Sequence, residues 1–271
     1  MQRLFRATLL AALAAAAPAA AQQPFSGKPE DIVRAEFIGG WRMADGTRMA
    51  ALKVRLAEGW KTYWRAPGDT GIPPRFDWAG SQNVASVAFR WPQPEVFDVS
   101  GLRIVGYRRE LVLPFAVIPQ DPGAPVRLMA RVELGVCETV CVPVNLDVSA
   151  DLPSGTGPDP EIVAALARMP VPGAQAGLSA ATCTTEPIAD GIRLTAKVEI
   201  PAVGQDEFAV IELADPAIWI SQAEVERRGP SLTAVSDLVP PEARPFPLDP
   251  SQVRITLLGG GRAVEIEGCT G

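Results

Sequence analysis

Histidine is absent from all 271 residues of the chain, and this absence excludes several classes of active site. A Ser-His-Asp triad, a Cys-His dyad and an HExxH zinc site all require histidine. The usual proton shuttle near neutral pH is missing for the same reason. We therefore expect any chemistry to depend on sulfur, carboxylates or lysine, and we expect neither a cofactor nor a metal site.

The sequence also lacks a basic run, since 25 basic residues face 31 acidic ones with a net charge of −6. An acidic surface is a poor match to a phosphate backbone. We therefore expect no nucleic-acid partner. A hydrophobic content of 47% with 21% charged residues is typical of folded domains rather than of disorder.

No apolar run after residue 22 approaches the roughly 20 residues that span a bilayer. Before it, Arg3 and Arg6 precede an alanine-rich apolar stretch, and Ala19–Ala21 offers the small residues that a signal peptidase reads. We predict a signal peptide over residues 1–21, whose removal takes two arginines and leaves a net charge of −8. We expect a secreted, soluble protein without a transmembrane segment.

Residues 22–152 are predicted to form one all-β domain. Short alternating or apolar runs are separated by turn residues, which favours a β-sandwich. The candidate strands are Val33–Trp41, Ala50–Leu56, Val84–Trp91, Leu111–Ile118, Val126–Leu134 and Val142–Val148. The many prolines suit turns and sheet edges and argue against long helices.

Residues 153–175 are predicted to be a linker containing one short helix, with Asp159 as its N-cap and Pro160 at its first position. Residues 176–271 are predicted to form a second, smaller β-rich domain. Its clearest strands are Ile192–Ile200 and Phe208–Leu213, and a hairpin is expected around the three glycines at 259–261.

Four cysteines in an exported protein indicate sulfur chemistry or disulfide staples. Cys137 and Cys141 lie four residues apart, and a straight strand would hold them roughly 13 Å apart, so the segment must turn for them to bond. Glu138 disfavours a reactive thiolate at Cys137, and no adjacent cation offsets it. The spacing fits a redox pair and a structural staple equally well.

Cys183 and Cys269 bracket the second domain. A bond between them would close a long loop and restrain the carboxy terminus, which favours a structural disulfide. Four cysteines allow three pairings, of which the local-plus-long one is the most economical.

Three ordered blocks in the first domain, 59–71 (GWKTYWRAPGDTG), 106–114 (GYRRELVLP) and 136–143 (VCETVCVP), carry a family resemblance. The first domain resembles the amino-terminal domain of the DsbD thiol:disulfide interchange protein. It is more similar to the variant found in the copper-tolerance protein ScsB, because three residues separate the cysteines here.

The resemblance implies an immunoglobulin-like sandwich in the periplasm and a cysteine pair that cycles between dithiol and disulfide. It implies Tyr63 as the aromatic residue near the cysteines and a cap loop over about Glu95–Val105. Phe97 is the candidate shielding side chain. In the parent family the later cysteine tends to form the mixed disulfide, which would be Cys141.

We expect a stand-alone thiol:disulfide interchange module without the membrane conduit or thioredoxin-like domain of full-length relatives. A thioredoxin-like protein or a CcdA/DsbD-type membrane protein would then be the redox partner, and exported proteins the clients. Two alternatives stay open: a scaffold protein with structural disulfides only, and a Cu(I)-handling protein using both thiols. Met43, Met49 and Met129 could add soft ligands for copper, although their scatter favours packing.

Overall fold

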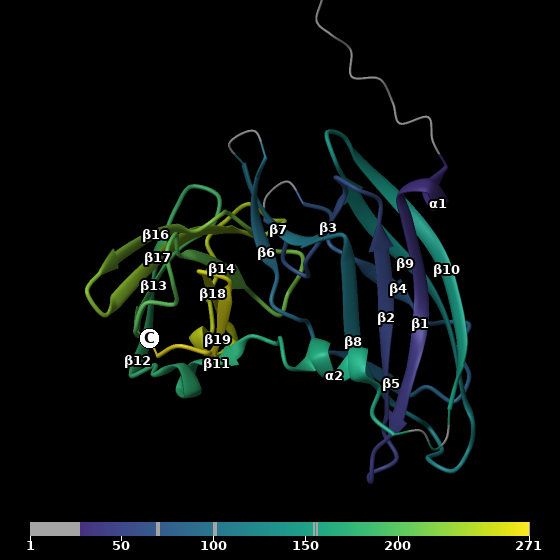
Figure 1. Cartoon of the computed structure of the whole chain (residues 1–271). Helices are drawn as coiled ribbons and strands as arrows, with labels where there is room; N and C mark the ends of the chain where they lie inside the picture. The colour runs from purple at the N-terminus through teal and green to yellow at the C-terminus, as the bar shows by residue number, and fades with distance from the viewer. Residues whose placement is uncertain (1–27, 69–70, 100–101, 154, 156, 271) are drawn as a thin grey trace, which may run out of the picture.

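The computed structural model describes residues 28–68, 71–99, 102–153, 155 and 157–270. The expected signal peptide at residues 1–21 lies outside them. The described part of the chain is mostly β-structure, arranged in four sheets that form two β-rich parts lying side by side (Figure 1). None of its helices is long and apolar enough to cross a membrane.

Two antiparallel sheets build the first part. The smaller sheet has the spatial order β1 (Val33–Arg42), β2 (Arg48–Leu56), β8 (Glu110–Ile118), β5 (Ser86–Phe89). The larger sheet has the order β10 (Cys141–Leu152), β9 (Val126–Cys137), β3 (Lys61–Tyr63), β7 (Leu102–Arg108), β6 (Glu95–Val99), and β4 (Arg75–Asp77) also pairs with β9. A short helix, α1 (Pro29–Ile32), precedes β1.

The core between these sheets is aromatic and aliphatic. Trp64 and Phe115 are fully buried, and Trp60 and Trp91 are 9% exposed. A cluster of stacked and edge-on rings contains Phe37, Phe76, Trp78, Phe89 and Phe115. Burying each such side chain contributes roughly 1.5–3 kcal/mol. Trp60, Trp64, Trp78 and Trp91 are therefore core residues.

In the hairpin of β9 and β10, alternation in the sequence gives one buried and one exposed face. Side chains along β9 alternate strictly, so that Val126, Leu128 and Val132 are buried while Arg127 and Arg131 are exposed. From residue 134 to its end the strand is buried on both faces. Other residues therefore cover the outer face of β9 near Cys137.

Helix α2 (Pro160–Leu166) follows the first part, as predicted. The Asp159 side chain accepts hydrogen bonds from the main-chain N–H groups of Glu161 and Ile162, at 2.8 and 3.2 Å. Ile162 is fully buried against the outer face of the smaller sheet, and Glu161 pairs with the buried Lys53 of β2. Met169 lies beyond the helix end and is 36% exposed.

The second part also contains two sheets. One has the order β11 (Val171–Pro172), β19 (Arg262–Glu267), β18 (Arg254–Gly259), β14 (Phe208–Glu212), in which only the β11–β19 pairing is parallel. The other has the order β12 (Ala180–Pro187), β13 (Ile192–Glu199), β17 (Ser231–Val239), β15 (Trp219–Ile220), with β16 (Glu224–Arg228) also paired to β17. Two 3₁₀ turns, η1 (Gly173–Ala176) and η2 (Pro250–Gln252), complete it.

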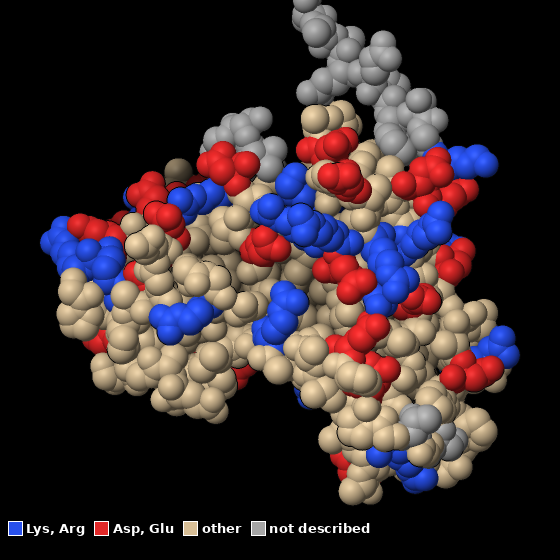
Figure 2. All heavy atoms as spheres, viewed as in Figure 1, with Lys and Arg blue, Asp and Glu red and all other residues tan. Residues whose placement is uncertain are grey.

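Apolar packing and ion pairs join the two parts. Phe208 and Val210 of β14 belong to the core cluster of the first part, whereas Ala209 and Ile211 belong to that of the second. Arg65 donates to Glu212 at 2.8 and 3.0 Å and also pairs with Glu265. Elsewhere the surface carries acidic and basic side chains interspersed, as the face in Figure 2 shows.

Candidate functional site

The pair Cys137 and Cys141 forms a disulfide at the tip of the β9–β10 hairpin. The two residues are direct cross-strand partners with Cα atoms 4.1 Å apart, and Glu138–Val140 form the connecting turn. Their environments differ. Cys137 is 5% exposed, whereas Cys141 is exposed to solvent. One sulfur is therefore accessible to a partner and the other is covered.

Tyr63 contacts both sulfurs. Its phenolic oxygen lies 2.8 Å from Sγ of Cys137 and 3.1 Å from Sγ of Cys141. Sulfur in a disulfide carries no hydrogen, so the phenol is the donor. The side chain is only 4% exposed, and this burial raises the pKa of Tyr63 above its ordinary value of 10.0. The hydroxyl therefore keeps its proton throughout the neutral range.

Two glycines on the flanking strands make room for β3, Gly135 for the Tyr63 ring and Gly106 for the main chain of Thr62 and Tyr63. A β-carbon at Gly135 would stand 2.7 Å from Cδ2 of Tyr63, and one at Gly106 would stand 2.1 Å from the carbonyl oxygen of Thr62. The Thr62 hydroxyl fixes β3 from its other face by donating to the Gly135 carbonyl at 2.9 Å. The Tyr63 ring and Ile72, whose Cβ would stand 2.6 Å from a β-carbon at Gly135, thus cover the outer face at the end of β9.

The segment predicted as a cap loop, Glu95–Val105, is a β-hairpin instead. Strands β6 and β7 pair through it, and Phe97 stands opposite Ile104. The prediction was wrong about its conformation because the paired strands satisfy main-chain groups that a loop would leave to solvent. Ile104, which sequence reasoning missed, is the residue that packs with Tyr63 and Cys137.

Phe97 is 5% exposed and lies on the same face of the sheet as Ile104. The guanidinium of Arg108 lies 4.6 Å from its ring centroid, and the Lys61 ammonium lies 6.0 Å from it. Both geometries are cation–π contacts. Phe97 is not a member of the buried cluster of Tyr63, Ile104 and Cys137, and its gating role remains a prediction.

Lys61 corrects the expected charge environment of the cysteines. Lys61 lies on β3 and is the direct cross-strand partner of Cys137 on β9 and of Arg108 on β7. Two cations therefore lie on the same face of the sheet as the buried sulfur, where the linear sequence indicated none. Glu138, expected to be the dominant local charge, extends toward Gly59, where a β-carbon would stand 2.6 Å from its Oε1.

The second disulfide joins Cys183 on β12 to Cys269 near the end of the chain, with Cα atoms 5.7 Å apart. Cys183 is 3% exposed and belongs to the core of the second part. Thr270 extends the sheet beside it, since its carbonyl accepts from the Cys183 N–H at 2.8 Å. Both cysteine pairs are thus bonded in the described structure.

The candidate copper ligands are not gathered. Met129 precedes Cys137 by eight residues on the same straight strand, roughly 26 Å away. Met49 is buried on the outer face of the smaller sheet, against helix α2. Within the described residues there is also no group of three or more cysteine, aspartate or glutamate side chains placed to hold a metal.

Comparison with known proteins decides the family of the first part. Residues 30–153 match the sequence profile of the family described as "Thiol:disulfide interchange protein DsbD, N-terminal". This part of the chain belongs to the DsbD N-terminal domain family. The Tyr63–Cys137–Cys141 cluster lies entirely within the matched range.

A solved structure extends the likeness beyond the DsbD N-terminal domain. The N-terminal periplasmic domain of ScsB from Proteus mirabilis matches with a TM-score of 0.64 and 24% sequence identity. The match covers 90% of this chain and 96% of that one, so both β-rich parts share its fold.

A protein of unknown function from Porphyromonas gingivalis W83 covers 87% of this chain and 98% of its own at 13% identity. Its TM-score of 0.19 does not indicate a shared fold. No curated protein sequence matches the chain.

Proposed function

We propose that this protein is a periplasmic thiol–disulfide exchange module whose redox pair is Cys137 and Cys141. The observation that carries the proposal is that the Tyr63 phenol lies within 3.1 Å of both sulfurs of a disulfide whose two cysteines differ in exposure. A structural staple needs neither an accessible sulfur nor a buried donor aimed at both. The periplasmic location rests on the disulfides and on the periplasmic ScsB domain of the same fold.

Exposure assigns different tasks to the two sulfurs. A partner thiolate attacks Sγ of Cys141, the sulfur that solvent reaches, and a new S–S bond forms. The Cys137–Cys141 bond breaks, and its electron pair leaves on Cys137 as a thiolate. Tyr63 donates to that sulfur from 2.8 Å, and the cations of Lys61 and Arg108 lie on the same face.

The cycle then closes through the partner. A second thiolate of the partner attacks the partner's own sulfur in the mixed disulfide and releases Cys141 as a thiolate. Each released thiolate takes one proton from solvent. The partner dithiol is oxidised by two electrons and the Cys137–Cys141 pair is reduced by two. The reverse sequence passes the electrons to an exported client.

We propose a thioredoxin-like or CcdA/DsbD-type membrane protein as the electron donor, since the DsbD family acts with redox partners. We propose a structural role for Cys183–Cys269. That bond closes a separation of 86 residues, and the chain-entropy model assigns such a closure about 4.5 kcal/mol.

Redox titration with mass spectrometric location of each bond tests the proposal. We expect the Cys137–Cys141 bond to open above about −300 mV, in the range of exchange-active pairs, while Cys183–Cys269 stays closed. The Cys137→Ser variant should trap a thioredoxin-like protein as a mixed disulfide through Cys141. The matched Cys141→Ser variant, which retains only the covered sulfur, should trap far less. If the Cys137–Cys141 bond has a reduction potential below about −300 mV and neither single variant traps a partner, the pair is a structural staple.

A further inference from the structure

The loop after β3 connects the disulfide site to the second part. It begins directly after Tyr63, whose hydroxyl contacts both sulfurs, and its second residue is Arg65. Arg65 donates to Glu212 at the end of β14, at 2.8 and 3.0 Å, and also pairs with Glu265 on β19. Two carboxylates of the second part therefore hold a side chain only two positions from the phenol of the redox site.

Arg65 is restrained from the first part as well. Its guanidinium lies over the ring of Trp64, 4.3 Å from the centroid, and Trp64 is fully buried in the core of the first part. The side chains of Arg65, Glu212 and Glu265 are all less than a quarter exposed. Solvent and salt screen charges weakly in such a setting, so the ion pairs hold the loop more firmly than surface pairs would.

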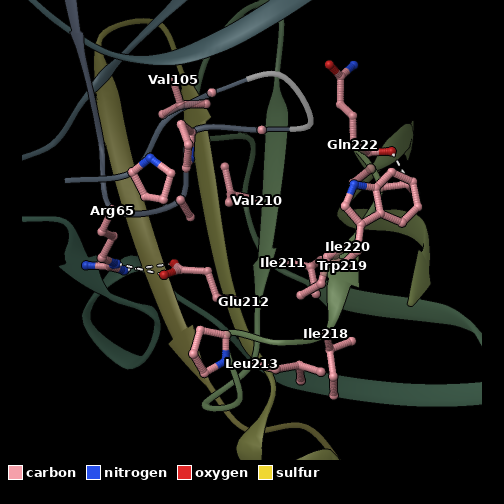
Figure 3. Close-up of a pocket in the computed structure, with 18 of the residues that line it drawn as sticks. Arg65, Val105, Val210, Ile211, Glu212, Leu213, Ile218, Trp219, Ile220 and Gln222 are labelled. Atoms are coloured by element: carbon pink, nitrogen blue, oxygen red, sulfur yellow. Dashed lines mark hydrogen bonds and ion pairs between the residues drawn. The ribbon is translucent and has the colours of Figure 1, made fainter. Parts of the chain in front are cut away.

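A cavity of about 430 Å³ lies between this loop and the second part (Figure 3). The loop lines it with Arg65, Pro67 and Gly68, and the second part lines it with β14 and with residues 215–223. Unfilled space offers no atoms to contact, so packing supports the loop poorly where the cavity lies. The Arg65–Glu212 ion pair crosses between the two walls at one side of the cavity and supplies the restraint that packing does not.

The restraint reaches Tyr63 through the main chain and through one close approach. The Trp64 N–H donates to the Val105 carbonyl at 3.0 Å, and the Val105 N–H donates to the Pro67 carbonyl at 3.1 Å, so the loop lies against β7. A β-carbon at Gly71 would stand 2.2 Å from Cβ of Pro67 and 3.1 Å from Cδ1 of Tyr63. The loop thus turns back onto the Tyr63 ring, and a shift of the loop changes the space in which the ring sits.

We propose that Arg65 is a positioning residue of the redox site, through which the second part holds the Tyr63 hydroxyl against the two sulfurs. Its relevance to exchange rests on the proposed function, whereas the coupling between the two parts does not. Arg65 acts through Tyr63 and leaves the balance of the exchange step unchanged. The second part, which lies outside the residues that match the DsbD N-terminal family, then affects how well the departing Cys137 thiolate is stabilised.

A double-mutant cycle on the rate of reduction by dithiothreitol tests the coupling. Arg65→Met should slow reduction about fivefold, because a phenol that is held less firmly donates less well to the departing thiolate. In the Tyr63→Phe background there is no hydroxyl to place, so Arg65→Met should leave the rate unchanged. Equal slowing in the two backgrounds would overturn the proposal, since Arg65 would then act without Tyr63.

Variants of the second part test the coupling from its other end. Glu212→Gln combined with Glu265→Gln should reproduce the slowing, and Arg65→Lys, which keeps the charge but not the planar fork, should slow reduction less than Arg65→Met. Arg227→Met is the matched control, because Arg227 donates to Glu207 at 2.6 and 2.7 Å in a pair of similar burial within the second part. It should lower stability and leave the reduction rate unchanged. Equal slowing in Arg227→Met would overturn the proposal, since loss of stability alone would explain the effect.

Proton release from Tyr63 gives a readout that does not depend on exchange. In Tyr107→Phe the tyrosinate signal belongs to Tyr63 alone, and adding Arg65→Met should lower its midpoint toward 10.0, because a loosened ring is less buried. If the wild-type pair resists reduction in the redox titration and this midpoint falls, the coupling stands and the exchange function fails. If Tyr63→Phe slows reduction while Arg65→Met changes neither the rate nor the midpoint, the coupling fails and the exchange function stands.

Discussion

The ring of Tyr63 lies so close to the main chain of Gly135 that a β-carbon there would stand 2.7 Å from Cδ2 and 2.8 Å from Cε2. Real β-carbons do not approach other atoms so closely, so the glycine is a condition for the tyrosine's position. The placement of the phenol between the sulfurs therefore depends on a residue of the neighbouring strand, two positions before Cys137.

Gly135→Ala should displace the Tyr63 ring and separate its hydroxyl from the sulfurs. Overpacking of this kind costs about 1–3 kcal/mol. We expect the free energy of unfolding to fall by that amount and the reduction of Cys137–Cys141 by dithiothreitol to slow. Gly155→Ala is the control, because a β-carbon there meets nothing within 4 Å. Chemical denaturation and stopped-flow reduction measure the two effects, and normal kinetics in Gly135→Ala would contradict the geometry.

Tyr63→Phe removes the hydroxyl and keeps the ring. A hydrogen bond to a charged group contributes about 1.5–3 kcal/mol, so the loss of this donor should slow departure of the Cys137 thiolate by roughly 10- to 100-fold. The rate of reduction by dithiothreitol measures this. Tyr107→Phe is the control, since its hydroxyl donates to the Pro92 carbonyl at 2.8 Å, away from the sulfurs. It should lower stability and leave the reduction rate unchanged.

Alkaline titration tests the burial of both tyrosines, which are the only two in the chain. Burial raises the pKa of Tyr63 and, more strongly, the pKa of Tyr107. The unfolded chain releases these protons near pH 10, before the folded protein does. Stability is therefore complete below about pH 10 and declines as the pH rises toward the folded-state values.

Tyrosinate absorbance should show no transition at pH 10 in the folded protein and should rise together with unfolding above it. In Tyr107→Phe the remaining signal belongs to Tyr63 alone and should also be shifted upward. A midpoint of 10 in that variant would show that the phenol beside the sulfurs is exposed to solvent, which the structure excludes.

The long strands of the first part could be read from the sequence in two ways. β9 and β10 alternate with period two, whereas β2 and β8 are buried on both faces and read as apolar runs. Strand β3 could not be read, since Lys61–Tyr63 is too short to show a period. The same strand carries Tyr63 and Lys61 to the cysteines. Pairing of β3 joins residues 43 to 47 positions apart on β7 and more than 70 positions apart on β9, which no local pattern indicates.

The second part was predicted less completely. β17 alternates well, but its buried face includes Ala234 and Ser236 beside Leu232 and Leu238, and small or polar residues conceal a period from hydropathy. β14 read as a compact apolar run, which agrees with the structure. That its two faces belong to different cores was beyond sequence reasoning, because the docking partner of an apolar face is set by tertiary packing.

The two disulfides should differ in what they contribute to stability. Chain-entropy arguments assign about 2 kcal/mol to the short Cys137–Cys141 loop and about 4.5 kcal/mol to Cys183–Cys269. Replacing Cys183 and Cys269 with serine should therefore destabilise the protein more than replacing Cys137 and Cys141. Denaturation of both double variants under oxidising conditions measures the difference. A larger loss from the Cys137–Cys141 pair would argue for a staple at the hairpin tip.

Arg65→Met should loosen the junction between the two parts. The side chains of Arg65, Glu212 and Glu265 are 18%, 14% and 24% exposed, so the variant leaves two carboxylates with little solvent and with Arg254, 4.0 Å from Glu265, as a remaining cation. Breaking a buried pair in this way costs about 3 kcal/mol at neutral pH.

Arg193→Met provides the comparison, because Arg193 and Asp237 form a bidentate pair at 2.7 and 3.0 Å that is far more exposed to water. Solvent screening makes such pairs weak, so this variant should lose much less stability than Arg65→Met. Chemical denaturation at neutral pH compares the free energies of unfolding of the two variants. Equal losses would mean that the Arg65 cluster is solvated like a surface pair. The two parts would then be joined chiefly by the packing of Phe208 and Val210 on the first core.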